Sequence, residues 1–328
     1  MNLLHINKRL IPVFITIGLF LLMYVFGLVR YDNFSSPQVF LNLFVDNAFL
    51  IIVAVGMTFV ILSGGIDLSV GSVIALTSMV VASLLVQGVP VWLVIPIALL
   101  VGPVLGFLMG CCIHYFQLQP FIVTLAGMFL ARGLSFVISV QTITIDHDFF
   151  KYMASTRIYV GDYFLSYSVL IALIVVVAAI FIAHYTKFGR NVYAIGGSEQ
   201  SAMLMGLPVG RTKIMVYTLS GFTASLAGIV FTFYMLSGYG LHANGFELNA
   251  IAAVVIGGTL LTGGVGYVAG SVVGVLILGT IQSLIVFEGS LSAWWTRIAI
   301  GLLLLLFIVL QRIIVMRTDH KKETVSAH

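Results

Sequence analysis

The chain has 328 residues, of which 61% are hydrophobic and only 8% are charged. Soluble domains are about 45–50% apolar and about 25% charged, and they have no means of covering so much apolar surface. The composition therefore excludes a soluble enzyme, a disordered regulator and a nucleic-acid-binding module. It indicates a membrane protein with many spans, in which the net charge of +4 is a signal of topology. The adjacent Cys111 and Cys112 lie in an apolar run and provide neither a disulfide framework nor a metal site.

Apolar runs of about 20 residues, long enough to cross the hydrocarbon core, recur along the chain. The first follows Lys8 and Arg9 and is too long for the apolar part of a signal peptide, so we expect it to remain as a span. The runs predict an all-α, polytopic membrane protein that forms a single transmembrane domain of about ten helices. The eighth reaches a full span only if it begins near 245, and it is otherwise a half-helix. The expected spans are 10–29, 39–62, 70–87, 91–116, 120–140, 166–184, 214–237, 245–262, 267–287 and 294–315.

The basic residues favour one orientation in the membrane. An even number of spans places both termini on the same side, and Lys and Arg collect in cytoplasmic segments. With both termini cytoplasmic, ten of the fifteen basic residues lie on the cytoplasmic side, and most acidic residues lie outside. The ten are Lys8, Arg9, Lys187, Arg190, Arg211, Lys213, Arg312, Arg317, Lys321 and Lys322.

Two glycine-rich segments interrupt the apolar runs. In each, a Gly-Gly pair (Gly64-Gly65 and Gly263-Gly264) is followed, after five residues, by Gly-Ser-Val. This match is compatible with an internal duplication, because transporters often carry broken helices at equivalent positions of two repeats. It is equally compatible with two unrelated tight turns. Asp67 precedes the helix expected from residue 70, where a capping or first-turn role is favoured over direct contact with a substrate.

Few ionisable side chains lie within the expected spans. Asp46 and Arg132 are the clearest, and such charges normally face a cavity or a partner. The histidines lie mostly in loops or at span ends, so the acids and histidines form no visible proton relay. No segment of the Thr-Val-Gly-Tyr-Gly type suggests an ion filter either. The pattern disfavours an ion-driven carrier and a channel.

The polar, basic segment 185–213 predicts a short helix over 199–205. Ser198 suits its N-cap and Glu199 suits the positive end of its dipole, while Gly206 followed by Pro208 ends it. Exposed methionine and leucine on such a helix are typical of a surface that docks onto a partner protein. The alternative is an amphipathic helix that lies on the bilayer.

Three long motifs, over 56–72, 189–206 and 245–259, resemble those of bacterial sugar permeases from ATP-binding-cassette (ABC) importers. The resemblance covers about residues 40–315 and is to the ribose, xylose and arabinose branch, in particular to galactofuranose importer permeases. It implies a fold like that of the vitamin-B12-importer (type II) permeases. It also implies a second permease copy or a related permease, cytoplasmic ATPase subunits and a periplasmic sugar-binding protein in the bacterial inner membrane.

The resemblance assigns the loop motif to a coupling helix that contacts the ATPase. One departure is that Gln200, Ser201 and Met203 replace the usual residues, with Met203 where the family often has an arginine. A family-wide ion pair at that point is therefore in doubt. The coupling residues carried over are Gly189, Arg190, Gly197, Ser198, Glu199, Ala202, Met203, Gly206 and Leu207.

The chain has no GxxxxGK[ST] motif, so it has no phosphate-binding loop of its own. We therefore expect a transport subunit without catalytic residues, metal or cofactor, driven by ATP hydrolysis on a separate chain through alternating access. An ion-driven secondary sugar transporter is the alternative. Residues of the motifs and of a candidate sugar pathway are Asn42, Asp46, Asn47, Thr58, Gly64, Gly65, Asp67, Ser69, Gly71, Glu247 and Asn249. For each polar one, hydrogen bonding between helices is an equally good explanation.

Overall fold

The computed structural model describes residues 11–292 and 294–326. Within these ranges the chain forms thirteen α-helices, one 3-10 turn (η2, Asp32–Ser35) and two small two-stranded sheets. Eight of the described helices are long and apolar enough to cross a membrane, and two further apolar helices are shorter. The prediction of an all-α, polytopic membrane protein is confirmed. The Lys8-Arg9 pair and Leu10, the expected start of the first span, lie outside the described residues.

Every expected span corresponds to an apolar helix, and seven of them match to within two residues at each described end. The apolar helices are α1 (Ile11–Arg30), α2 (Pro37–Leu62), α3 (Val70–Val86), α4 (Val91–Tyr115), α5 (Pro120–Ile138), α7 (Tyr167–Tyr185), α10 (Val209–Met235), α11 (Phe246–Ile256), α12 (Val268–Glu288) and α13 (Trp294–Ser326).

Three helices differ from the expected bounds. Helix α10 begins at Val209 rather than at 214, because Pro208 ends the preceding turn and is tolerated just before a helix. Helix α13 continues to Ser326 instead of ending at 315, since polar residues at the end of a span still favour helix. Helix α11 ends at Ile256 instead of reaching 262, because Gly257 and Gly258 follow and Gly258 has φ +92°. The half-helix alternative therefore describes α11.

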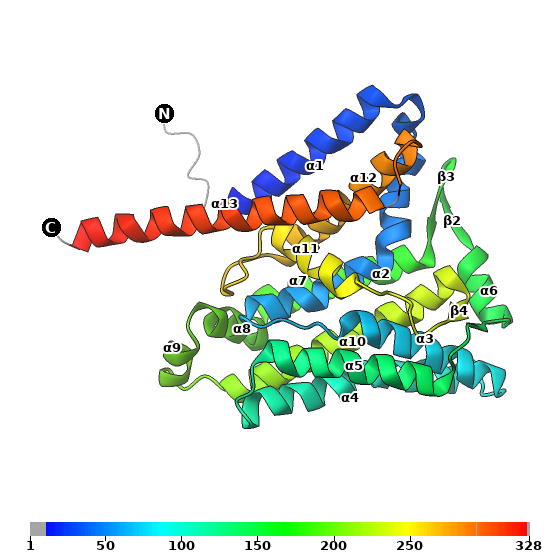
Figure 1. The fold of residues 1–328 in the computed structure, drawn as a ribbon, viewed down its shortest axis with the longest axis horizontal. Helices are drawn as coiled ribbons and strands as arrows, with labels where there is room; N and C mark the ends of the chain where they lie inside the picture. The colour runs from blue at the N-terminus through cyan, green and yellow to red at the C-terminus, as the bar shows by residue number, and fades with distance from the viewer. Residues whose placement is uncertain (1–10, 293, 327–328) are drawn as a thin grey trace.

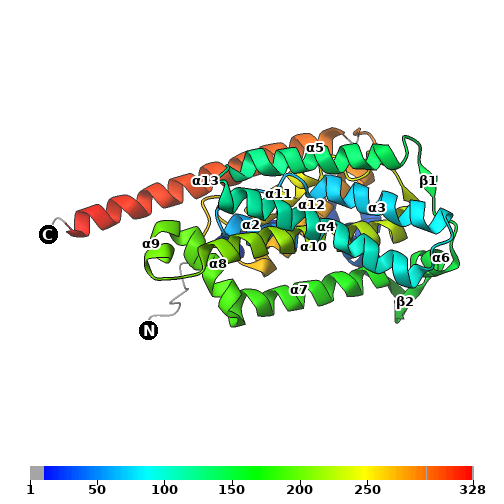
Figure 2. The same ribbon diagram turned by 90° about the horizontal axis from the view of Figure 1, so that it is seen from below.

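Helices α2, α3 and α10 form the centre of the bundle, and α2 is buried almost continuously from Asn47 to Leu62. Helices α1 and α13 lie on one side, while α4 and α5 lie on the other (Figure 1). Viewed at 90° to this direction, α7 runs along a third side (Figure 2). Large apolar side chains on α1, α4, α5, α7 and α13 are exposed, as expected of surfaces that face lipid or another membrane subunit.

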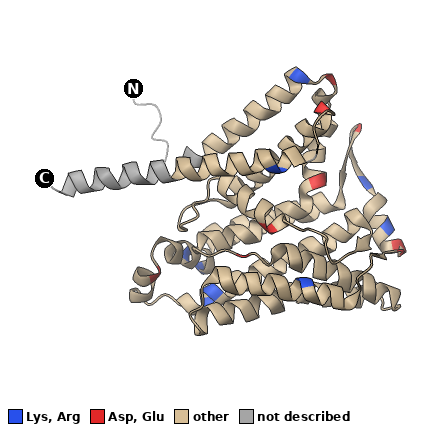
Figure 3. Ribbon diagram, in the orientation of Figure 1, with Lys and Arg blue, Asp and Glu red and all other residues tan. Residues whose placement is uncertain are grey.

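The two ends of the bundle carry different small elements. At one end lie α8 (Lys187–Gly197) and α9 (Glu199–Leu204), and at the other lie α6 (Asp148–Ser155) and a hairpin of β2 (Arg157–Val160) and β3 (Tyr163–Ser166) (Figure 1). A second pairing joins β1 (Ile143–Thr144) to β4 (Ser237–Gly238). Most of the charged residues lie toward these two ends (Figure 3), as the solvation cost of charge in a membrane requires.

Candidate coupling and transport site

Helix α9 forms as the sequence predicts, although it ends one residue earlier. Ser198 is its N-cap, and its Oγ accepts a hydrogen bond from the backbone N–H of Ser201 at 3.2 Å. Met205 is the C-cap, and Gly206 follows with φ +76°. The chain then turns back, because the N–H of Leu207 donates to the carbonyl of Ala202 at 3.1 Å.

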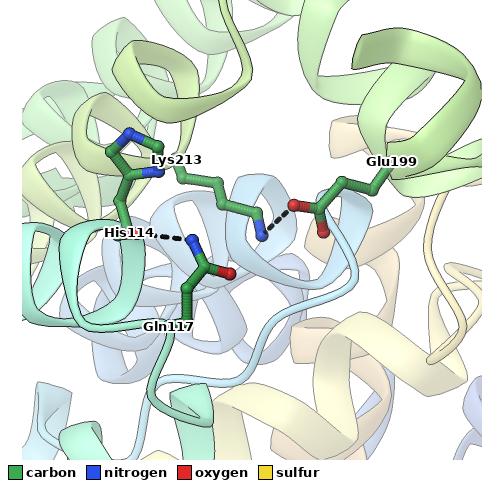
Figure 4. Close-up of polar contacts among 4 residues, drawn as sticks. All are labelled: His114, Gln117, Glu199 and Lys213. Atoms are coloured by element: carbon green, nitrogen blue, oxygen red, sulfur yellow. Dashed lines mark hydrogen bonds and ion pairs between the residues drawn. The ribbon is translucent and has the colours of Figure 1, made fainter. Parts of the chain in front are cut away.

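One face of α9 holds it to the bundle, and the other is free in the described structure. Ala202 is fully buried in a small cluster with Ile195 and Val209. The Nζ of Lys213, on α10, lies 2.6 Å from a carboxylate oxygen of Glu199 (Figure 4). On the other face, the side chains of Met203, Leu204 and Met205 are 61%, 84% and 68% exposed. Helix α9 thus presents an apolar tip on a fixed base.

A second loop helix, α8, precedes α9, and the sequence analysis did not predict it. The hydroxyl of Thr186 caps it by accepting a hydrogen bond from the N–H of Gly189 at 3.2 Å. Val192 and Ile195 are buried along one face, and Arg190 is exposed. The Thr-x-x-Gly cap and the apolar spacing of 188, 192 and 195 were signals that could have identified it.

Three Gly-Gly pairs meet where α8 ends. These are Gly64-Gly65 after α2, Gly196-Gly197 at the end of α8, and Gly263-Gly264 in the segment between α11 and α12. The N–H of Gly264 donates to the carbonyl of Leu62 at 2.9 Å. A Cβ on Gly196 would overlap that carbonyl and would lie 2.5 Å from the Gly264 nitrogen, whereas a Cβ on Gly197 would meet nothing within 4 Å. We call this contact the glycine junction.

Asp67 is fully buried between α2 and α3. One carboxylate oxygen accepts hydrogen bonds from the N–H and hydroxyl of Ser69, at 2.9 and 2.6 Å, and the other accepts one from the hydroxyl of Ser220 at 2.7 Å. The N-cap position of α3 belongs to Ser69, so Asp67 is not the N-cap itself. It supports the start of α3 from two residues earlier and ties that start to α10.

Two of the predicted pathway residues bond within or between helices. The hydroxyl of Thr58 donates to the carbonyl of Ala54 at 2.6 Å and lies 2.7 Å from the hydroxyl of Ser271 on α12. The amide of Asn47 donates to the carbonyl of Leu43 at 2.9 Å. Both side chains are buried, which matches the alternative of hydrogen bonding within the helix packing.

Other predicted residues lie at separate positions. Asn42 accepts a hydrogen bond from Gln38 at 2.8 Å, and Asp46 is exposed on α2. Glu247 is buried, and a Cβ on Gly71 would overlap its carboxylate. Gly65 also has no room for a side chain, because a Cβ there would overlap the hydroxyl of Tyr217. The predicted residues therefore do not converge on one pocket.

The larger of two described cavities, about 680 Å³, lies between α11, α12 and α13. Asn249 is the one predicted pathway residue that lines it, together with Asn244, Gln282 and Arg297, and Phe246 adds an aromatic ring. The smaller, about 270 Å³, lies near the β2–β3 hairpin and includes Phe49, Arg157 and Tyr234. Polar groups beside an aromatic ring suit a polyhydroxylated ligand.

Comparison with known proteins gives one consistent family. The profile described as "Branched-chain amino acid transport system / permease component" matches residues 39–308. The chain is 51% identical to the inner membrane ABC transporter permease protein YjfF of Escherichia coli, over 93% of each chain. It is 44% identical to the fructose import permease protein FruG of Bifidobacterium longum, over 97% of this chain and 95% of FruG.

The same comparison finds the ribose import permease protein RbsC of Bacillus subtilis, at 37% identity over 90% of this chain and 91% of RbsC. No solved structure matches the chain at comparable significance. The relatives are transport subunits and not enzymes, and they match the chain over nearly its whole length. The chain therefore belongs to the permease-component family that this profile describes. It is a transport subunit with many membrane spans.

Proposed function

We propose that this permease is the membrane-spanning subunit of an ABC importer that carries a sugar across the bacterial inner membrane. The observation that carries the proposal is its similarity, over about nine-tenths of both chains, to permeases named for the import of fructose and ribose. In the complex it works with cytoplasmic ATPase subunits, a second permease and a periplasmic sugar-binding protein. Galactofuranose is the proposed sugar, on the resemblance of the motifs alone.

The energy enters through α9 in this proposal. Its apolar tip of Met203, Leu204 and Met205 is the part of the described cytoplasmic loop with most exposed apolar surface. Lys187, Arg190, Arg211 and Lys213 lie in the same loop or in the first turns of α10, which supports a cytoplasmic location for this end. Both termini are then cytoplasmic, and the β2–β3 hairpin faces the binding protein.

We expect ATP to drive uptake when the permease is reconstituted with its ATPase subunits and binding protein in proteoliposomes. Labelled galactofuranose should accumulate when ATP is supplied on the ATPase side, and an ion gradient without ATP should give no accumulation. Ribose and fructose in parallel vesicles test the choice of sugar. Uptake that persists without the ATPase subunits would overturn the importer proposal in favour of the ion-driven carrier.

The sugar passes the larger cavity in this proposal, in the half of the membrane nearer the binding protein. Helix α11 is a half-helix that begins there with Gly245 at φ +85°, and transporters place substrate sites at such breaks. Asn249 and Gln282 offer amide groups to sugar hydroxyls from facing helices. Polar side chains are costly in an apolar bundle, so the position of these two amides supports a role in binding the sugar.

The pathway predicts a loss of apparent sugar affinity in Asn249→Leu and Gln282→Leu. Each removes hydrogen bonds worth about 1 kcal/mol, so the KM for uptake should rise about fivefold. Gln87→Leu, an exposed amide at the far end of α3, is the matched control and should leave KM unchanged. Uptake by both cavity variants at the wild-type KM would place the pathway elsewhere.

A further inference from the structure

We infer that α8 transmits the movement of α9 to the two glycine-rich breaks of the membrane bundle, with Gly196 and Tyr193 as its positioning residues. This inference rests on the proposed function, in which an ATPase moves α9. It gives a mechanical role to a helix that contains three of the coupling residues named from the motif resemblance, Gly189, Arg190 and Gly197.

The first contact of α8 is the glycine junction. The backbone of Gly196 lies directly against the carbonyl of Leu62 and the N–H of Gly264, because Gly196 has no Cβ to hold them apart. Flexible side chains would absorb a displacement by changing rotamer, whereas packed backbone does not. A shift of α8 is therefore passed to the end of α2 and to the segment between α11 and α12 together.

The second contact is a hydrogen bond from Tyr193. Its hydroxyl donates to the carbonyl of Gly266 at 2.8 Å. Burial, with a smaller contribution from Tyr267, raises the pKa of Tyr193 to about 12, so the hydroxyl keeps its proton under physiological conditions. The bond holds α8 to the segment just before α12. On the opposite side, the ring of Phe188 stacks on Phe59 of α2, with ring centroids 6.0 Å apart.

The third requirement is a stiff connection between α9 and α8. Only Ser198 separates the two helices, and its N–H donates to the carbonyl of Ala194 at 3.1 Å. Ile195 of α8, Ala202 of α9 and Val209 of α10 form one buried cluster. Because short helices packed in this way move as a unit, displacement of the α9 tip rotates α8 against the glycine junction.

Both breaks lead to the helices that would open and close the pathway. The segment after α2 carries Asp67 and begins α3, while the segment after α11 begins α12. The larger cavity is lined by the far parts of α11 and α12, so these two helices carry a movement at the second break along their length to the cavity. The two matched pairs of the sequence, Gly64-Gly65 and Gly263-Gly264, are thus the two places where the movement of α8 is passed to the bundle.

The test uses the whole complex in proteoliposomes, with Tyr193→Phe and Gly196→Ala. Tyr193→Phe keeps the ring and removes only the bond to Gly266, and Gly196→Ala forces α8 away from both breaks. We expect both variants to bind the ATPase as the wild type does, while the sugar transported per ATP hydrolysed falls about fivefold or more. Tyr185→Phe, an exposed tyrosine at the end of α7, and Gly18→Ala in α1, where an added Cβ meets nothing within 4 Å, are the matched controls.

Hydrogen exchange gives a readout independent of transport. In the wild-type complex we expect nucleotide to change the amide protection of residues 63–69 and 257–267, and in Tyr193→Phe this response should be lost. A variant pair with wild-type coupling and exchange response would overturn the inference, as would loss of ATPase binding in Tyr193→Phe, which would make α8 part of the docking surface. If the Gly196→Ala variant does not insert into the membrane, the results for Tyr193→Phe alone decide whether the inference holds. A wild-type complex that shows no ATP-driven uptake contradicts the proposed function itself.

Discussion

Leu204→Glu should strongly weaken assembly with the ATPase while leaving the permease folded. Leu204 is 84% exposed at the tip of α9, so a glutamate there costs the isolated permease little. In a docked interface the same carboxylate would be desolvated without a partner, and an unpaired buried charge costs about 2 kcal/mol or more. We expect the affinity for the ATPase subunit to fall about 30-fold or more, with a parallel loss of ATP-driven uptake.

The measurement is binding of the purified ATPase to the solubilised permease, followed by uptake in vesicles. Tyr159→Glu, an exposed residue on β2 at the other end of the bundle, is the control and should bind the ATPase normally. If Leu204→Glu binds the ATPase as tightly as the wild type, the docking role of α9 is wrong. That result would favour the alternative in which α9 lies on the bilayer surface.

Asp67→Leu should be among the most destabilising single changes in the bundle. Leucine has the same branched skeleton of heavy atoms, but it leaves the N–H of Ser69 and the hydroxyls of Ser69 and Ser220 without their acceptor in a fully buried place. Each buried group without a partner costs about 1–3 kcal/mol, so the sum reaches about 3 kcal/mol or more. Asp67→Asn retains one carbonyl oxygen for Ser69, and we expect it to lose about 1 kcal/mol.

Thermal unfolding of the detergent-solubilised permease checks this order. The Tm of Asp67→Leu should fall by about 5 °C or more, with Asp67→Asn between it and the wild type. Asp162→Leu, at the exposed turn of the β2–β3 hairpin, provides the control for loss of a carboxylate and should change the Tm little. Equal Tm values for Asp67→Leu and wild type would show that the hydrogen bonds of Asp67 are not structural.

The polar segment 185–213 shows where local sequence was sufficient to predict structure and where it failed. Ser198, Gly206 and Pro208 are the start and stop signals of α9, and they act within a few residues of the helix they limit. Helix α8 has a weaker signature because Gly189, Gly196 and Gly197 lower its intrinsic helix propensity. It forms through tertiary contacts that bury Val192 and Ile195.

The residues of the candidate sugar pathway were harder to predict from the sequence than the helices were. Polarity within a span selected Asn42, Asp46, Asn47 and Thr58 alike, and the motif resemblance added Glu247 and Asn249. The structure separates them, because Thr58 and Asn47 bond within the helix packing while Asn249 lines a cavity with Gln282. Gln282 and Arg297 were missed, since a single polar residue near a span end carries no sign of the cavity that it faces.

The sequence by itself determined that this protein is a helical bundle with many membrane spans and that one short helix, α9, forms in the polar segment between two of them. Both follow from local chemistry, since an apolar run of about 20 residues in lipid must satisfy its backbone hydrogen bonds as a helix. Only the tertiary structure decided that Gly64, Gly196 and Gly264 meet at one junction. A glycine permits close backbone approach but does not specify the backbone that approaches, so contacts between segments far apart in sequence arise only when the whole bundle packs.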